Sequence, residues 1–281
     1  CESNVIVLRS YKEEAKKRSV EDFVGYFRKR FETISNILRT RQELKEVISL
    51  SRLSGRKNND KICIIGMVNE KRITKNDNIL VKIEDFTGNT IIVISKRKTE
   101  LFNNARDLCD DEIIGVVGVK HDSLIYVEDL IFPEVPISQG LKKCDDEVYC
   151  VFISDMHVGN KEFLNKEFGN FLKWINGEDG DDEQLAVCEK IKYLFIGGDL
   201  VDGVGIYPGQ ENDLELKDIY KQYDHFTEFI KKIPKSVKVI MCPGNHDALR
   251  LTEPQPVIGK EYCVELLKME NVYMVSNPAL V

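Results

Sequence analysis

Three short apolar runs in the second half of the chain each lead into a cluster of polar residues. The runs cover residues 148–153, 193–196 and 237–242, and they have the length and composition of strands buried on both faces of a sheet. Helical patterns of apolar residues lie between them, at 163–175 and 219–230. This alternation of strands and helices predicts an α/β domain.

The three polar clusters contain side chains that bind metal ions. Asp155 and His157 follow the first run, Asp199 follows the second, and Asn245 and His246 follow the third. Ligands of open α/β sheets bind beyond the carboxyl ends of the strands, so the clusters should converge. The spacing of Asp155 and His157 places both on one side of an extended segment. Glycines at 197, 198, 203 and 244 allow the backbone to approach an ion or a phosphate closely.

Carboxylate, imidazole and amide oxygen together suit manganese, iron or zinc better than calcium. Two such ions about 3.5–4 Å apart polarise a phosphate and supply hydroxide at neutral pH. Each cluster by itself has an ordinary explanation, since Asp-x-His is common on surfaces and in cores, and Gly-Asp is common in turns. Three such clusters at successive strand ends favour a two-metal site.

The three clusters resemble the first three motifs of the calcineurin-like metallophosphoesterase superfamily: Asp-Met-His at 155–157, Gly-Asp-Leu-Val-Asp-Gly at 198–203 and Gly-Asn-His-Asp at 244–247. The resemblance implies a β-sandwich core flanked by helices. It also implies that Asp155 and His157 bind one metal, that Asp199 bridges both metals, and that Asn245 binds the second.

The resemblance implies a catalytic role for His246, which would face the scissile phosphate and stabilise charge or protonate the leaving oxygen. We expect the adjacent Asp247 to orient His246. If the site had lost its metals, His246 would be an ordinary structural histidine.

Three further segments narrow the resemblance: Gly-Ile-Tyr-Pro-Gly-Gln at 205–210, Glu-Pro-Gln-Pro at 253–256 and Ser-Asn-Pro-Ala-Leu-Val at 276–281. They are similar to the small subunits of archaeal D-family DNA polymerases. This similarity implies a proofreading 3′–5′ exonuclease that uses two divalent ions, with manganese favoured and iron or zinc as alternatives. Its partners would be the large catalytic subunit and a single-stranded or mismatched DNA primer 3′ end. Contacts with a sliding clamp also belong to this resemblance, although no separate motif for them is visible.

The chain departs from the superfamily in one respect. The superfamily takes further metal ligands from a later His and from a Gly-His-x-His cluster, whereas the histidines here are His121, His157, His225 and His246. His225 lies in an amphipathic helical pattern. We therefore expect the chain to be a fragment of an enzyme, inactive and poor at binding metal by itself. Tight stoichiometric binding of two manganese ions by residues 1–281, measured calorimetrically, would contradict this expectation.

Between residues 61 and 132 the apolar period becomes that of strands. Five short runs rich in Ile and Val follow one another at 62–68, 79–83, 90–94, 113–119 and 124–130, with a polar helical segment at 99–108 after the third. This order predicts an OB-fold barrel. The region is balanced or acidic in charge and has few aromatic residues, so docking onto protein is favoured over binding of single-stranded DNA. The Pro-containing stretch 132–136 marks a boundary.

The N-terminal region is basic although the net charge of the chain is −7. Residues 9–57 hold fourteen Lys or Arg against seven Asp or Glu, a surplus of +7. An apolar stripe predicts a helix at 20–38 with ends near Ser19 and Thr40, followed by a helical stretch at 44–50 and a polar linker at 54–60. Phe23, Phe27 and Phe31 need a partner, either the barrel or another subunit. The basic face is a solvated surface or a DNA contact, and the sequence leaves both open.

We accordingly divide the chain into a helical, basic segment and linker at 1–58, an OB-fold domain at 59–136 and a phosphoesterase domain at 147–281, incomplete at its C-terminus. The eight cysteines are scattered without a CxxC pair, which predicts buried, reduced thiols in a cytoplasmic protein. No apolar run could cross a bilayer, which argues against a membrane partner. The acidic stretch 177–183 predicts a surface loop that lacks a calcium-loop pattern.

Two other functions fit parts of the pattern. One is a non-catalytic scaffold or accessory subunit of a DNA polymerase, because small subunits of eukaryotic replicative polymerases resemble this layout with eroded metal motifs. Here the ligand residues within reach persist, which favours activity in the full-length protein. The other is a protein phosphatase, which would carry Arg and Glu where this chain has Gly203 and Asp247.

Overall fold

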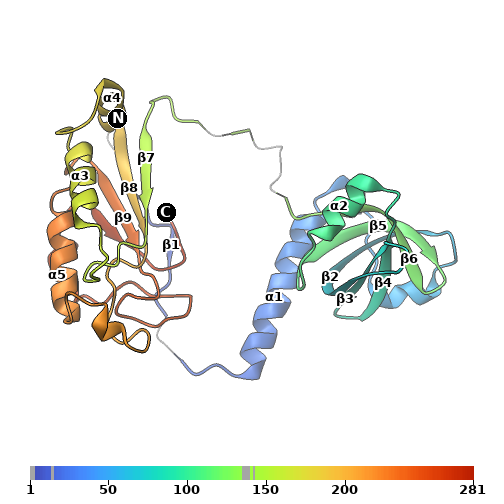
Figure 1. The fold of residues 1–281 in the computed structure, drawn as a ribbon. Coiled ribbons are helices and arrows are strands. Elements are labelled where there is room, and N and C mark those ends of the chain that lie inside the picture. Colours follow the sequence, from blue (N-terminus) through green and yellow to red (C-terminus); the bar gives the residue numbers. More distant parts are fainter. Residues whose placement is uncertain (1–3, 14–15, 135–139, 142) are drawn as a thin grey trace. The chain divides into compact units, whose positions relative to one another are not determined.

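The computed structural model describes residues 4–13, 16–134, 140–141 and 143–281. The chain divides into two compact units, Lys16–Leu141 and a second unit that combines Cys1–Ala15 with Lys142–Val281 (Figure 1). The segment expected as 1–58 is therefore shared between the units, and the three-domain division stays a prediction. Of the expected boundary stretch 132–136, Val135 and Pro136 lie outside the described residues.

The unit Lys16–Leu141 contains a closed five-stranded barrel. Its strands are β2 (Lys61–Ile73), β3 (Ile79–Asp85), β4 (Gly88–Ile94), β5 (Ile113–His121) and β6 (Leu124–Ile131), in the order β2-β3-β4-β6-β5. Helix α2 (Thr99–Arg106) follows the third strand. Alternate Ile and Val side chains of the strands fill the interior, among them the fully buried Ile64, Val81 and Ile92. The predicted strands, helix and barrel are confirmed.

The predicted N-terminal helix is confirmed as α1 (Val20–Leu38). It begins after Ser19, as predicted, because Ser19 and Asp22 form a capping box. Phe31 packs on Phe86 of the barrel unit with ring centroids 4.8 Å apart. Phe23 and Phe27 remain 57% and 55% exposed. Phe31 of the apolar stripe thus packs against a residue of its own unit. The N-terminal half of the stripe is exposed to solvent within this unit.

The predicted helical stretch 44–50 is wrong. The structure has two 3₁₀ helices, η1 (Gln42–Leu44) and η2 (Leu50–Gly55), and the second of them takes up the start of the predicted linker. Between them the chain runs beside β2, where the Ile48 amide donates to the Cys63 carbonyl at 2.9 Å. Leu44 and Leu50 are both buried. Their spacing therefore reflects burial against the barrel and not a helix period.

The second unit contains a parallel four-stranded sheet in the order β10-β9-β8-β7. The strands are β7 (Tyr149–Ile153), β8 (Ile191–Gly197), β9 (Lys238–Cys242) and β10 (Val272–Met274). Its helices are α3 (Asn165–Ile175), α4 (Asp182–Cys188), α5 (Ile219–Ile230), η3 (Gln210–Asn212) and η4 (Leu266–Lys268). A separate two-stranded sheet pairs β1 (Arg9–Ser10) with β11 (Ala279–Leu280). The α/β class predicted for this half is confirmed.

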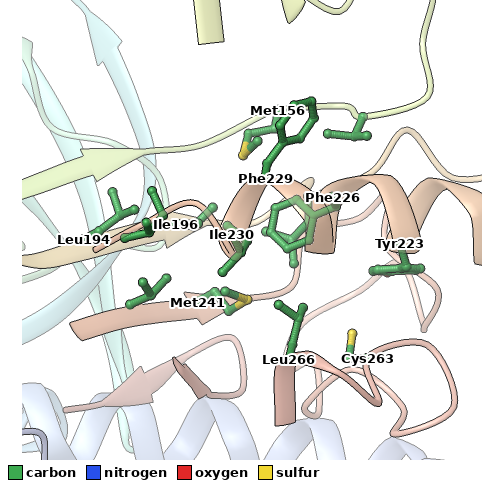
Figure 2. Close-up of a cluster of buried hydrophobic side chains, with 14 of the residues drawn as sticks. Met156, Leu194, Ile196, Tyr223, Phe226, Phe229, Ile230, Met241, Cys263 and Leu266 are labelled. Carbon is green, nitrogen blue, oxygen red and sulfur yellow. The ribbon is translucent and has the colours of Figure 1, made fainter. Parts of the chain in front are cut away.

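The core of this unit lies between the sheet and helices α3 and α5, which lie along one face of it (Figure 1). Figure 2 shows side chains from β8, β9 and α5 gathered in this core, including Ile196, Met241 and Phe226. Packing in this core holds β7, β8 and β9 in register. Ile153 of β7 lies beside Ile196 of β8, and Ile196 lies beside Met241 of β9. The carboxyl ends of β7, β8 and β9 consequently meet at one edge of the sheet.

Two smaller expectations need correction. The stretch 177–183 is not entirely a loop, because α4 begins at Asp182, where Asp181 and Gln184 form a capping box. The seven described cysteines are free, but Cys109, Cys144 and Cys150 are exposed. Within the described part of the chain, every helix falls short of the length and apolar character that crossing a bilayer requires.

Candidate metal centre

The loops after β7, β8 and β9 bring His157, Asp199 and His246 together. Each of these residues offers a ligand atom, and the three atoms lie within 4.8 Å of one another. His157 Nε2 is 3.8 Å from Asp199 Oδ2. The rings of His157 and His246 stand nearly perpendicular, with centroids 4.5 Å apart. The convergence predicted from the strand ends is therefore present in the structure.

The local backbone differs from the extended segment that we expected around Asp155 and His157. Asp155, His157 and Asp199 have φ values of 55°, 48° and 48°, all in the left-handed region that non-glycine residues rarely adopt. The Asp155 amide donates to the Gly198 carbonyl at 3.1 Å, and the His157 amide to the Asp199 carbonyl at 3.0 Å. These bonds tie the first loop to the second and hold the unusual conformations, which are typical of functional sites.

Asp202 orients both histidines, although it was not among the site residues predicted from the sequence. Its buried carboxylate lies 3.1 Å from His157 Nδ1, and its carbonyl accepts a hydrogen bond of 2.7 Å from His246 Nδ1. Gln210 Nε2 in turn donates to Asp202 Oδ2 at 2.8 Å and to its carbonyl at 2.9 Å. With Nδ1 engaged, the Nε2 atoms of the two rings are the nitrogens available to a metal ion or a phosphate. The sequence signal that could have identified Asp202 is its place as the second Asp of the motif Gly-Asp-Leu-Val-Asp-Gly.

Asp247 was expected to orient His246, and its side chain binds other groups of the site loops. Its buried carboxylate accepts hydrogen bonds from the amides of Gly244 (2.9 Å) and Leu200 (3.3 Å) and from the Tyr223 hydroxyl (3.0 Å). Burial raises the pKa of Asp247 to about 6, against the lowering effect of these hydrogen bonds. The residue ties the third loop to the second and to α5, so it can position His246 only through the backbone.

Two glycines allow the loops to approach as closely as they do. At Gly244, a side chain would overlap the Asp199 carboxylate and backbone. At Gly203, which has a φ of 77°, it would overlap the His246 carbonyl. The fully buried Gln222 of α5 binds Gly203 at both its amide and its carbonyl, with distances of 2.9 and 3.1 Å. These glycines thus permit close packing of the loops, while their predicted role toward an ion or a phosphate stays a prediction.

The other two expected ligands, Asp155 and Asn245, are not among the three clustered residues. Both are exposed. Asp155 lines a cavity of about 930 Å³ together with His157, Asp202 and His246. Because two imidazoles and a carboxylate face one another beside this cavity, the donor set fits a divalent transition-metal ion. Asp155 and Asn245 remain available as further ligands.

Comparison with known proteins identifies the class. Residues 149–278 match the family of calcineurin-like phosphoesterases. The second unit therefore contains a calcineurin-like phosphoesterase domain, as the three motifs predicted. Members of this family use divalent metal ions, in agreement with the cluster of His157, Asp199 and His246.

Over almost all of its length the chain is similar to proteins named DNA polymerase II small subunit. The protein of Methanothermobacter thermautotrophicus is 40% identical over 262 residues, covering 93% of this chain and 53% of that one. The protein of Archaeoglobus fulgidus is 42% identical over 264 residues, covering 94% and 51%. The protein of Methanocaldococcus jannaschii is 39% identical over 264 residues, covering 92% and 44%. The resemblance to polymerase small subunits is confirmed, and the chain spans about half the length of these relatives.

Solved structures add little. The Stn1–Ten1 complex of S. pombe is 13% identical over 25% of this chain and 55% of that chain, with a TM-score of 0.24.

Proposed function

We propose that the full-length protein is the proofreading subunit of a replicative DNA polymerase and removes nucleotides from DNA 3′ ends by two-metal hydrolysis. The observation that carries this proposal is the cluster of His157, Asp199 and His246 within a chain similar to polymerase small subunits. The partners that follow are the large polymerising subunit and a mismatched or single-stranded primer end. A sliding clamp is a further partner consistent with this role.

In this proposal Asp155 and His157 would hold one divalent ion, Asn245 would hold the second, and Asp199 would contribute to both. Manganese is the ion that the resemblance favours. Bound ions would polarise the scissile phosphate and supply hydroxide near neutral pH. His246 lies in the same cluster as His157 and Asp199, so it either faces the phosphate or completes a metal site.

The chain's own residues prepare His246 for a proton transfer. Its Nδ1 donates to the Asp202 carbonyl, so that hydrogen bond holds a proton on Nδ1 and leaves Nε2 as the reacting nitrogen. Nε2 would face the phosphate, where in its protonated form it would stabilise charge or pass that proton to the leaving oxygen. Asp247 secures the loop that carries His246 by binding the Gly244 amide.

The test is an exonuclease assay of the full-length protein in manganese, with and without its large subunit, on a primer with a mismatched 3′ end. We expect Asp199→Ala and His246→Ala each to abolish turnover, while an exposed carboxylate change such as Asp179→Ala leaves it intact. Full activity in both site variants would contradict the proposal.

A non-catalytic scaffold is the second candidate, because the relatives are named for a polymerase subunit and not for a nuclease. It predicts that the full-length protein binds its large subunit tightly and that the complex shows no manganese-dependent loss of mismatched 3′ nucleotides. The same assay therefore separates the two candidates.

We further propose that the barrel docks onto protein instead of binding DNA. The structure gives Lys71 a structural task, because its ammonium donates to the carbonyls of Arg106 and Leu108 at the end of α2. The informative variants are thus Arg72→Ala and Lys75→Ala, which leave these bonds in place. They should leave DNA affinity nearly unchanged, and a large loss with a reduced salt slope would contradict docking.

A further inference from the structure

The cavity beside the metal centre is lined by two chemically different groups of side chains. Asp155, His157 and His246 belong to the polar group, and Phe163 and Leu164 belong to the apolar group. These two apolar residues come from the connection between β7 and α3, which also carries the first metal motif. The polar group suits metal ions and phosphate, whereas the apolar group suits an uncharged, flat group.

Phe163 and Leu164 contribute differently to the apolar group. The Phe163 ring is half-buried and contacts Phe229 with centroids 5.5 Å apart, so it belongs to the edge of the core. Leu164 is 66% exposed although it lines the cavity. Single exposed leucines are common. This one is notable because His157 and His246 of the metal cluster line the same cavity.

Tyr207 lines the same cavity from another loop, between β8 and α5. It is 38% exposed, and its ring centroid lies 6.4 Å from that of His246. Its hydroxyl donates to Asp213 Oδ2 at 2.9 Å, which leaves the ring as the contact surface. The preceding Ile206 amide donates to Gln210 Oε1 at 2.8 Å, and Gln210 also binds Asp202. The position of the Tyr207 ring is therefore coupled to the residue that orients both histidines.

We propose that Leu164 and Tyr207 form a subsite for the nucleobase of the nucleotide whose phosphate lies at the cluster of His157, Asp199 and His246. This inference rests on the proposed nuclease function and names the substrate feature that the site recognises. A base stacks on an aromatic ring or packs on an apolar side chain whatever its sequence, as removal of any terminal nucleotide requires.

The charge of the cavity agrees with this division. Its lining includes the carboxylates of Asp155, Glu162, Glu167 and Asp213, and its one lysine, Lys161, donates to the Asn212 carbonyl at 2.6 Å. An anionic phosphate is repelled here unless divalent ions are present, whereas a neutral base is not. Binding of the phosphate therefore depends on metal, whereas the apolar side chains supply binding that does not.

The test uses the full-length protein and two fluorescent single-stranded DNAs that differ only at the 3′-terminal nucleotide, which has a base in one and is abasic in the other. A phosphorothioate at the last linkage slows cleavage, and manganese is present. Anisotropy titrations should show at least about fivefold tighter binding of the DNA that keeps its base. Leu164→Ala and Tyr207→Ala should bring this ratio close to one, while Tyr207→Phe should preserve it.

Leu267→Ala is the matched control, because Leu267 is a similarly exposed leucine of the same unit that does not line the cavity. It should leave the ratio unchanged. An undiminished ratio in both Leu164→Ala and Tyr207→Ala would overturn the subsite, as would equal binding of the two DNAs by the unaltered protein.

Hydrolysis of a phosphodiester that joins two abasic deoxyribose units, a small diester without a base or an aromatic ring, separates this result from failure of the proposed function. Rates on this probe should fall in Asp199→Ala and stay within about twofold in Leu164→Ala. If the unaltered protein cleaves the probe but neither binds nor cleaves DNA, the nuclease function itself fails and the subsite with it.

Discussion

At the scale of single residues, Asp202 connects the candidate metal centre to the structure behind it. It contacts His157 through its carboxylate and His246 through its carbonyl, and Gln210 binds both groups from the other side. A ligand histidine whose second nitrogen is held in this way keeps one tautomer and one ring orientation. Asp202 therefore affects metal affinity even if its side chain never contacts the ion.

We predict that Asp202→Asn weakens manganese binding by the full-length protein by about 10–100-fold. The amide keeps the size of the carboxylate, but it removes the negative charge that polarises His157 and it presents a donor to His157 or to Gln210. Calorimetric titration with manganese measures the change. Asp179→Asn, at an exposed position, is the control, and an unchanged dissociation constant in Asp202→Asn would contradict this role.

Gly244→Ala should destabilise the phosphoesterase unit by about 1–3 kcal/mol, because the added methyl group overlaps the carboxylate and the amide of Asp199. Urea unfolding with fluorescence detection measures the free energy. Gly169→Ala in α3 is the control, since nothing lies within 4 Å of its new methyl group. That change should stabilise the unit by up to about 1 kcal/mol. Equal effects of the two substitutions would contradict the close approach of the loops.

The sequence identified the candidate site residues but not how the backbone presents them. His157, Asp199 and His246 were predicted to meet because parallel strands end at one edge. The left-handed conformations at Asp155, His157 and Asp199 carry only a weak local sequence signal, because Asp and His adopt this region more often than most residues but far less readily than glycine. They result from hydrogen bonds between loops that are distant in the chain, which only the folded unit supplies.

At the scale of elements, prediction succeeded where a local signal and a burial pattern agreed. Helix α1 begins after Ser19 as expected, because the cap and the apolar stripe indicate the same start. The stretch 44–50 was misassigned because Leu44 and Leu50 are buried against the barrel from an irregular connection. Helix α4 was missed although its capping box is readable at Asp181 and Gln184, since its acidic residues suggested a loop.

Helix α1 provides a test at this scale, because its N-terminal half is exposed within its own unit and depends on its cap. Ser19→Ala removes the oxygen that accepts from the Asp22 amide. We expect amide exchange in the first turn of α1 to accelerate about fivefold, the equivalent of about 1 kcal/mol for a lost cap. Ser19→Asn keeps a capping oxygen and should exchange at the original rate. Unchanged exchange in Ser19→Ala would show that contacts outside the described unit hold this turn.

At the scale of the whole molecule, the division into two units was only partly predictable. The spacing of apolar residues in the sequence predicts both the barrel and the α/β sheet. Strand β1, by contrast, joins the second unit by pairing with β11 across almost the entire chain, and a two-residue strand leaves no periodic pattern. The sequence could place the metal cluster in the second unit, but not the N-terminal segment that belongs with it.

Because His157, Asp199 and His246 all lie in the second unit, metal should stabilise that unit alone. Burial, with Asp247 as a second cause, raises the pKa of the Cys263 thiol to about 12 from about 9, so alkylation at pH 8 reports opening of this unit. The stabilisation that the protonated Cys263 thiol contributes is present below pH 9 and is lost as the pH rises toward 12. In the full-length protein, manganese at about 100 times its dissociation constant should slow Cys263 alkylation about 100-fold. Cys63 of the barrel unit, read by mass spectrometry in the same sample, should label at an unchanged rate, and equal slowing at both cysteines would contradict independent units.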